Sequence, residues 1–358
     1  MNARENVLAL LRREPYEWVP VEFSLCPSLV EEYRSRTGET MPYSEYFHFP
    51  WQGVGDIAVP KNDNLYLGYH PNLKAGAEID RWGVAHEPGS EAAKHMTYMR
   101  CPLRGIDSLA EVKAYPLPDY AGGDASHQKK QADAIREKGL AVMGGMQCTI
   151  WETSWYIRGM EDLMMDMMSE DPIAEYLLDA VTERAVIRAR SFAEAGVDLL
   201  YLGDDIGMQR TPMMSVDLYC RWIKPRLKQV IDAARAVNPN ILVLYHSCGY
   251  VIPFIPHLIE VGVDVLNPIQ PESMDFREIY RDFGGKVSFH GTIGTQTTMP
   301  FGTPEQVRAK VWEHLEIAKN YGGLLPAPTH LLEPEVPWEN ILAYVQACAE
   351  YFKSFGKI

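Results

Sequence analysis

Short runs of hydrophobic residues alternate with helical patterns from about residue 140 onward. The runs are rich in leucine and β-branched residues, as expected of strands that are buried on both faces. Such alternation predicts parallel strands joined by helices. The predicted strands cover residues 19–24, 140–145, 197–202, 241–245, 263–266, 287–289 and 323–326. A closed barrel needs eight strands, so we expect the remaining one to be degenerate or hidden in the first half of the chain.

The predicted helices have clear start signals. Asp171 precedes Pro172, which predicts an N-cap with proline at the first helical position and a helix that runs to about residue 195. Thr303 and Gln306 form a capping box that starts another helix. Two more helices are predicted to start at Ser215 and Pro337.

The first 135 residues are irregular and rich in aromatic residues, proline and glycine. The first 15 residues predict a surface helix, and residues 43–51 (YSEYFHFPW) predict either a satellite core or a lid over the barrel mouth. In the lid interpretation, Tyr46 and Trp51 bind a flat substrate. The methionines at 164, 165, 167 and 168 are predicted to pack in the core.

These patterns predict one α/β domain over residues 1–358, a (β/α)8 TIM-type barrel that is distorted. Residues 1–135 would form an aromatic-rich N-terminal extension and lid with the first strand, and residues 136–358 the regular β/α units. A doubly wound open sheet is the alternative. The sequence disfavours it because no glycine-rich strand-to-helix phosphate loop is present.

Composition excludes several classes of function. The net charge is −14 and no basic cluster occurs, so a nucleic-acid partner is not expected. No apolar run reaches the ~20 residues that cross a bilayer, and the first residues lack the layout of a signal peptide. The six cysteines are scattered with no CxxC pair, which favours reduced thiols in a cytoplasmic protein.

Polar residues gather where the predicted strands end. The carboxyl ends of barrel strands share one rim, where active sites lie. The residues at these positions are Gln147, Cys148, Asp204, Asp205, His246, Cys248, Asn267, His290, Thr329 and His330. We expect Gln147, Asn267 and His290 to bind substrate.

His246 and Cys248 are the sharpest local signal. Residues two apart in an extended chain point the same way, so imidazole and thiolate can converge on one ion. These are ligands that zinc prefers, and a catalytic zinc site uses three of them. The alternative is a buried histidine beside an inert cysteine. The third ligand could be His330 or His290.

Three carboxylates are candidate catalytic groups. Asp204 and Asp205 could form a catalytic acid/base pair, bind a metal or cap a helix, and because they are adjacent only one of them is expected to point into the site. Glu152 could bind substrate or cap a helix.

Several motifs together resemble the uroporphyrinogen decarboxylase superfamily, which includes decarboxylases and zinc-dependent methyltransferases that work with corrinoid proteins. The motifs are DRWG at 80–83, GMEDL at 159–163, GDD at 203–205, HSCG at 246–249, FHGTIG at 289–294 and APTHLLEPEVPWENI at 327–341. The resemblance covers most of the chain. It implies that His246 and Cys248 bind zinc together with His330, which stands where the thiol-methylating branch has a later cysteine.

The resemblance favours the methyltransferase branch. The decarboxylases have an arginine-bearing RQAGR segment after the first strand, whereas this chain has VPVEFSLCPSLVEEY there and no arginine before Arg34. The decarboxylases also lack the HxC pair. The resemblance therefore implies methyl transfer between a small substrate and a corrinoid on a partner protein, because the chain has no DxHxxG cobalamin motif of its own.

Replacing the third sulfur ligand by histidine makes zinc more electrophilic, which favours O-demethylation, with a methoxylated aromatic as the candidate substrate. Three alternatives stay open. They are a methylcorrinoid:thiol methyltransferase, a decarboxylase similar to uroporphyrinogen decarboxylase, and a metal-free barrel without catalytic activity.

Overall fold

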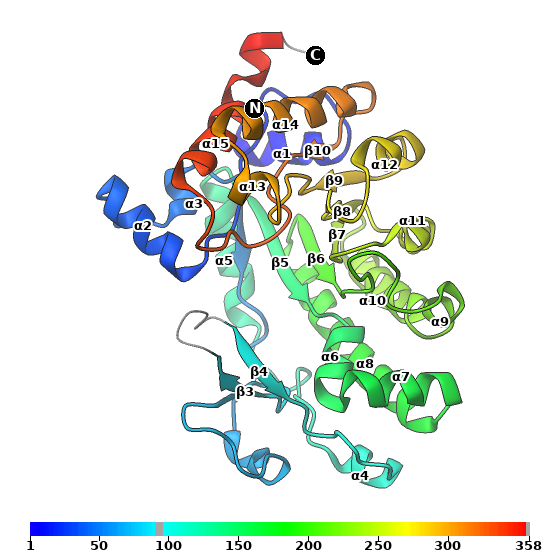
Figure 1. Cartoon of the computed structure of the whole chain (residues 1–358). Coiled ribbons are helices and arrows are strands. Elements are labelled where there is room, and N and C mark those ends of the chain that lie inside the picture. The colour runs from blue at the N-terminus through cyan, green and yellow to red at the C-terminus, as the bar shows by residue number, and fades with distance from the viewer. Residues whose placement is uncertain (90–95, 356–358) are drawn as a thin grey trace.

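A curled parallel sheet of seven strands forms the centre of the computed structural model, which describes residues 1–89 and 96–355. The strands lie in the order β1-β5-β6-β7-β8-β9-β10, and every neighbouring pair is parallel. Their bounds are β1 Trp51–Val54, β5 Ala141–Gln147, β6 Leu199–Gly203, β7 Leu242–His246, β8 Val265–Asn267, β9 Ser288–His290 and β10 Leu324–Leu325. Figure 1 shows the strands curling around a central axis with helices outside them. This is the distorted TIM-type barrel that the sequence predicts.

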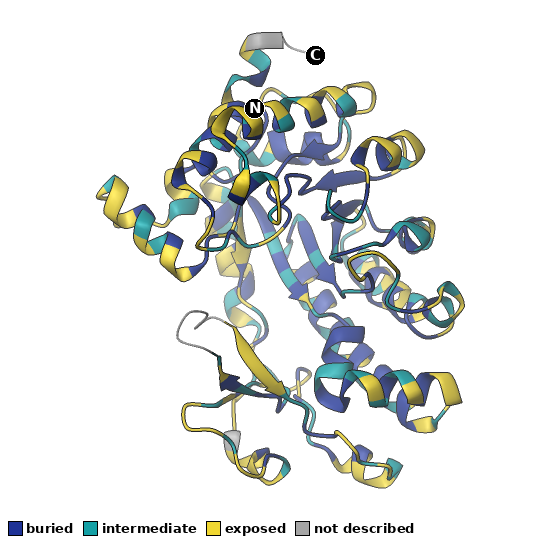
Figure 2. Cartoon of the chain, in the orientation of Figure 1, coloured by how far each residue is buried: buried dark blue, intermediate teal, exposed yellow. Residues whose placement is uncertain are grey.

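The outer helices bury one face against the sheet and expose the other (Figure 2). The longer ones are α5 Ser126–Glu137, α8 Pro172–Ala195, α10 Lys224–Val237, α14 Pro304–Ile317 and α15 Trp338–Phe355. Shorter helices are α2 Pro27–Thr37, α3 Tyr43–Tyr46, α4 Leu109–Ala114, α6 Trp151–Arg158, α7 Met160–Ser169, α9 Val216–Trp222, α11 Ile255–Val261, α12 Phe276–Phe283 and α13 Thr298–Phe301. The predicted start signals are confirmed, with side-chain caps from Asp171, Ser215 and Thr303.

The strand predicted at residues 19–24 does not form, and this prediction was wrong. The segment is extended but makes only one bridge, in which Leu332 donates from its backbone N to the carbonyl of Ser24 (2.8 Å) and accepts from Cys26 (3.0 Å). Pro20 has no N–H to give to a ladder. The strand hidden in the first half is instead β1, which pairs with β5.

Helix α1 (Ala3–Leu11) lies under the barrel, so the prediction of a surface helix was wrong. Val7, Leu10 and Leu11 are buried to within 1% of full burial. They pack in one cluster with the first residues of the central strands, including Ala141, Leu199 and Leu242. The helix therefore closes the end of the barrel opposite the carboxyl ends of the strands.

A second, antiparallel sheet of three strands follows β1 in the chain. It has the order β2-β3-β4, with β2 Glu78–Ile79, β3 Ala85–Pro88 and β4 Thr97–Arg100. Asp80 forms the turn between β2 and β3 by accepting from the backbone N–H groups of Trp82 and Val84. Gly83 has φ +80°, and a Cβ there would lie 2.0 Å from the Tyr115 hydroxyl, so only glycine fits.

The aromatic segment at residues 43–51 is mainly core. Tyr43, Phe47 and Phe49 pack with Phe23. The methionine prediction was half wrong, because Met167 is buried whereas Met165 and Met168 are about 70% exposed. Across the described residues, none of the helices has the length and apolar character needed to cross a bilayer.

Candidate metal centre

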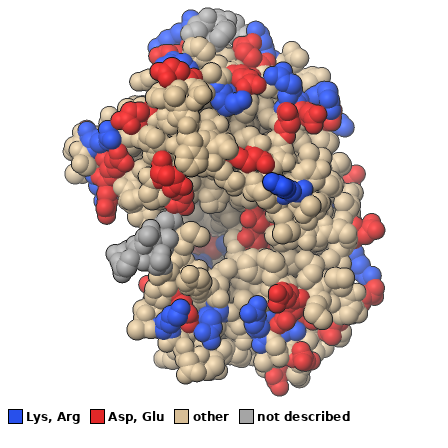
Figure 3. Space-filling view, viewed as in Figure 1, with Lys and Arg blue, Asp and Glu red and all other residues tan. Residues whose placement is uncertain are grey.

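The site lies where the central strands end, on a face that is hollowed near its centre (Figure 3). Register places Gly203 opposite His246 and His246 opposite Asn267, so the ends of β6, β7 and β8 lie at one level. Two cavities open there. The barrel cavity has a volume of about 560 Å³ and reaches down to Met143 and Leu244 inside the barrel. The rim cavity, of about 550 Å³, lies beside it and shares Thr329, His330 and Leu331 with it.

Asp205, His246 and Cys248 bring three metal-ligand atoms within 4.8 Å of one another. His246 Nε2 lies 3.4 Å from Cys248 Sγ and 3.7 Å from Asp205 Oδ1. Asp205 Oδ1 also accepts from the backbone N–H of Cys248 at 2.7 Å, which holds the two loops together. One sulfur, one nitrogen and one oxygen form a donor set that fits zinc. These three residues could therefore hold the metal.

The backbone of the HSCG turn is shaped by Gly249. Its φ is +80°, and a Cβ there would lie 2.6 Å from the carbonyl oxygen of Met208. Its N–H donates to Gln270 Oε1 at 3.0 Å. The loop after β7 can therefore lie directly against the loop after β6, which brings Cys248 beside Asp205.

Asn267 fixes the proton on His246. Its Nδ2 lies 2.9 Å from the carbonyl oxygen of His290, which can only accept, so its Oδ1 faces His246. His246 Nδ1 lies 2.6 Å from that Oδ1 and must carry the proton. The lone pair of His246 is therefore on Nε2, the atom nearest Cys248 and Asp205. Such outer hydrogen bonds typically orient a metal-binding histidine.

His290 and Glu22 extend this network. His290 Nδ1 accepts from Asn267 Nδ2 at 2.6 Å, so the His290 proton is on Nε2, which donates to Glu22 Oε2 at 3.0 Å. Both ring nitrogens of His290 are thus used, and His290 lies outside the group of metal-ligand atoms. Glu22 was missed in the sequence. A single acidic residue within a run expected to be a buried strand was the signal that could have found it.

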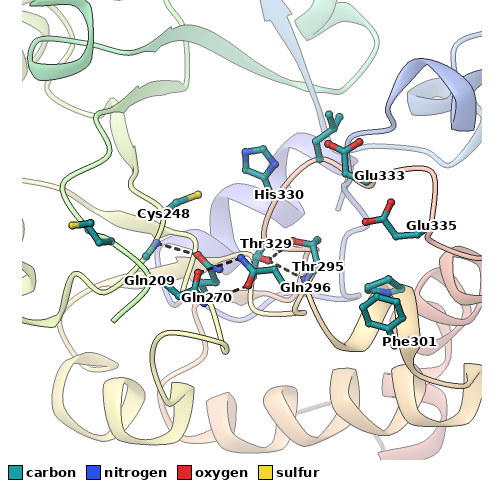
Figure 4. Close-up of a pocket in the computed structure, with 15 residues that line it drawn as sticks. Gln209, Cys248, Gln270, Thr295, Gln296, Phe301, Thr329, His330, Glu333 and Glu335 are labelled. Atoms are coloured by element: carbon teal, nitrogen blue, oxygen red, sulfur yellow. Dashed lines mark hydrogen bonds between the residues drawn. The ribbon is translucent and has the colours of Figure 1, made fainter. Parts of the chain in front are cut away.

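His330 lies beside this group but its ring nitrogens do not belong to it. Its ring centroid is 6.3 Å from that of His246, and its side chain is exposed where the two cavities meet. Figure 4 shows it among the residues that line the rim cavity, between Cys248 on the left of the view and Glu333 on the right. The pKa of His330 is lowered, first by partial removal from water and then by neighbouring His246.

The two adjacent aspartates have different surroundings. Asp204 is fully buried and accepts from the backbone N–H groups of Ile150 and Glu152 at the start of α6 (2.9–3.1 Å). Burial raises the pKa of Asp204 well above its usual value. It lines neither cavity and acts as a cap for α6, whereas Asp205 faces the barrel cavity.

Glu152 holds Asp205 in place. Its Oε2 accepts from the backbone N–H of Asp205 (3.1 Å), and its Oε1 accepts from the Tyr156 hydroxyl (2.7 Å). Burial, and then the charge of Asp205, raises the pKa of Glu152. Cys148 lies next to Tyr156 (Sγ to Oη 3.5 Å), and burial raises the pKa of this thiol to about 12.

Of the predicted substrate-binding residues, Gln147, Trp51, Asn267 and His290 line the barrel cavity. The Trp51 ring packs on His290 with centroids 5.4 Å apart. Tyr46 is not among the residues that line either cavity, and its ring packs instead on Tyr33.

Comparison with known proteins shows the family to which the chain belongs. The family model of uroporphyrinogen decarboxylase (URO-D) matches residues 98–351, so the chain belongs to this family. A methylcobamide:CoM methyltransferase MtaA of Methanosarcina barkeri is 26% identical over 222 residues, 61% of each chain. A methylated-thiol–coenzyme M methyltransferase of Methanosarcina mazei is 25% identical over 195 residues, 54% of this chain and 49% of that one. The alignments thus span less than two thirds of these relatives.

A solved methyltransferase from Methanosarcina mazei has the same fold. It superposes with a TM-score of 0.69 and covers 98% of this chain and 99% of its own, at 20% identity. At this identity the likeness establishes the fold of the chain alone.

Proposed function

We propose that this chain is a zinc-dependent methyltransferase that moves a methyl group between a small thiol and a corrinoid carried by a partner protein. The observation that carries the proposal is the group formed by Asp205, His246 and Cys248 at the mouth of the barrel cavity. The family membership and the names of the relatives support it.

Zinc fits these three residues because imidazole, thiolate and carboxylate are its usual ligands. Bound there, zinc would act as a Lewis acid and keep a substrate thiol deprotonated at neutral pH. Without a metal, burial and the charge of Asp205 raise the pKa of the Cys248 thiol, so metal binding is expected to release a proton from it.

The protein's own residues supply orientation and a dry environment. Asn267 keeps the His246 lone pair directed at the group, and Glu152 keeps Asp205 in place. Trp51, Leu244 and Met143 give the barrel cavity an apolar wall. Removal of water from a thiolate and its methyl donor increases the rate of methyl transfer.

The transfer needs no further reactant. An electron pair of the thiolate sulfur forms the new bond to the methyl carbon, and the pair of the broken cobalt–carbon bond stays on the corrinoid. The thiol proton leaves for solvent when the thiolate forms. The reverse direction removes a methyl group from a methylated thiol.

O-demethylation is the second candidate. The donor set of the group has one sulfur and one carboxylate oxygen, and because an oxygen donates less electron density than a second sulfur would, a bound zinc would polarise an ether oxygen more strongly. The aromatic rings of Trp51, Tyr156 and Tyr201 in the barrel cavity would suit a methoxylated aromatic substrate.

One experiment separates these activities. Zinc-loaded protein is incubated with methylcobalamin and a panel of thiols, and separately with cob(I)alamin and a panel of methoxylated aromatics, while the corrinoid spectrum is followed. We expect demethylation of methylcobalamin that depends on thiol and is lost with a zinc chelator. If cob(I)alamin is methylated by methoxylated aromatics and no thiol is active, the substrate is an aryl methyl ether and the proposed thiol is wrong. If the protein binds no zinc and neither reaction occurs, this result would support the metal-free alternative.

A further inference from the structure

We infer that the barrel cavity selects a substrate with a positively charged tail, a small thiol that bears an ammonium group, and disfavours one with an anionic tail. This inference rests on the proposed methyl transfer to or from sulfur and specifies the chemical class of that thiol.

The charges that line the two cavities are all negative among the described residues. Glu22, Glu152 and Asp205 line the barrel cavity, and Glu333 and Glu335 line the rim cavity. No lysine or arginine is found among the described residues that line either of them. An anionic tail would therefore lose its hydration without gaining a cationic partner, which is costly.

The histidines do not change this balance. His290 accepts at Nδ1 from Asn267 and donates at Nε2 to Glu22, so neither of its ring nitrogens is left to bind an anionic tail. A zinc ion would bring two positive charges, but the Cys248 thiolate and the Asp205 carboxylate offset them. The zinc charge is then fully offset by these two ligands, so it does not balance the negative charge of Glu22.

Glu22 is held firmly enough to act as a binding group. Its backbone is fixed by the buried hydroxyl of Tyr344, which lies 3.3 Å from the Glu22 N and 3.2 Å from its carbonyl oxygen. His290 fixes Oε2, and none of the described residues donates to Oε1. A fixed carboxylate with a free oxygen is a good acceptor for an ammonium group, because a charged hydrogen bond is stronger than a neutral one.

The walls beside Glu22 add a second reason. Trp51 lies next to His290, and Tyr201 lies next to His246 (ring centroids 5.4 and 6.4 Å apart). Both rings line the barrel cavity together with Glu22. Aromatic faces attract ammonium groups, and the attraction is larger when water is removed. The sulfur end of the substrate would then lie at the metal group and the ammonium end at Glu22.

Three thiols of similar size test the inference by charge alone: 2-aminoethanethiol, 2-mercaptoethanol and 2-sulfanylethanesulfonate. Their binding to zinc-loaded, full-length protein is measured by calorimetry. We expect the ammonium thiol to bind at least about tenfold more tightly than the sulfonate, as one charged hydrogen bond would give.

The variant Glu22→Gln should reduce this ratio of dissociation constants to near one. The matched control Glu14→Gln removes the same charge from an exposed residue just after α1, at the closed end of the barrel, and should leave the ratio within about twofold of wild type, because solvent and salt screen a distant charge. Thermal unfolding of both variants checks that they fold. Equal or tighter binding of the sulfonate, or an unchanged ratio in Glu22→Gln, would overturn the inference.

Methyl transfer is measured separately with the same three thiols. A charge preference in binding with no methylation of any thiol would contradict the proposed function and leave the charge selection in place. Methylation that favours the sulfonate would support the proposed function and contradict the charge selection.

Discussion

Asn267 Oδ1 lies 2.6 Å from His246 Nδ1, and this contact decides which nitrogen of His246 faces Cys248 and Asp205. The orientation of the amide is itself fixed, because Asn267 Nδ2 is bound to the carbonyl oxygen of His290. One buried asparagine thus links the backbone of β9 to the metal group at the end of β7.

Replacement of Asn267 by alanine should weaken zinc binding by about 10- to 100-fold, as is typical when a partner of a metal-binding histidine is lost. The measurement is zinc affinity against a competing chelator. Asn240→Ala, at an exposed position before β7, is the control and should bind zinc as wild type does. Unchanged affinity in Asn267→Ala would mean that Asn267 does not orient His246.

The third zinc ligand is tested by a pair of variants. The geometry favours Asp205, whereas the resemblance to zinc-dependent methyltransferases favours His330. Wild-type protein is expected to bind about one zinc per chain. We expect Asp205→Asn, like Cys248→Ala, to lose most of this zinc, and His330→Ala to keep zinc and lose activity. Elemental analysis after gel filtration measures both, and loss of zinc in His330→Ala alone would make His330 the ligand.

The buried His314 on α14 should make stability depend on pH. Its side chain is 5% exposed, and its Nδ1 lies 3.0 Å from the Thr292 hydroxyl. Burial lowers the pKa of His314 to about 4. Between that value and the ordinary pKa of 6.5, the unfolded chain binds a proton that the folded chain does not, so acid destabilises the fold. The loss on acidification from pH 7 to 4 is up to about 3 kcal/mol.

His314→Gln removes the titrating group and can still bond to Thr292. Urea unfolding at several pH values should show a flatter dependence for this variant than for wild type. His127→Gln, on the outer helix α5, is the control and should follow the wild-type curve. If both variants follow the wild-type curve, His314 does not contribute to the acid sensitivity.

Shortening a buried side chain of α1, the helix that closes the barrel, should destabilise the fold. Leu10 is fully buried in the cluster that α1 forms with the central strands, so Leu10→Ala should lower the free energy of unfolding by roughly 2–5 kcal/mol. The control is Met168→Ala, at a side chain that is 72% exposed on α7, with a change below about 0.5 kcal/mol. Equal small changes in denaturant unfolding would show that α1 is not part of the core.

The sequence predicted the regular β/α units well because each of their strands is an apolar run with helix signals on either side. It missed β1 because Trp-Gln-Gly-Val is four residues long, includes a glycine and has two exposed positions. It mistook residues 19–24 for a strand because an apolar run does not reveal whether a partner pairs with it. The apolar side of α1 was visible, but periodicity does not say which surface that side covers.

For the candidate site, the convergence of His246 and Cys248 could be predicted because both lie two residues apart at a strand end. That one of the two adjacent aspartates would face inward could also be predicted, but which one depends on the helix that Asp204 caps. Glu22 could not be connected with His290, because the two are 268 residues apart and only the closed fold brings them together.

Closure of one end of the barrel by α1 has a kinetic consequence for the proposed reaction. Because α1 covers the other end of the strands, a small thiol and the corrinoid protein would both reach the barrel cavity from the carboxyl ends of the strands. The corrinoid protein would cover the opening of the cavity while it is docked. The thiol would therefore have to bind first, and the methylated product could dissociate only after the corrinoid protein has left. Turnover would then follow a compulsory order, and an excess of the corrinoid protein would slow it by trapping product inside.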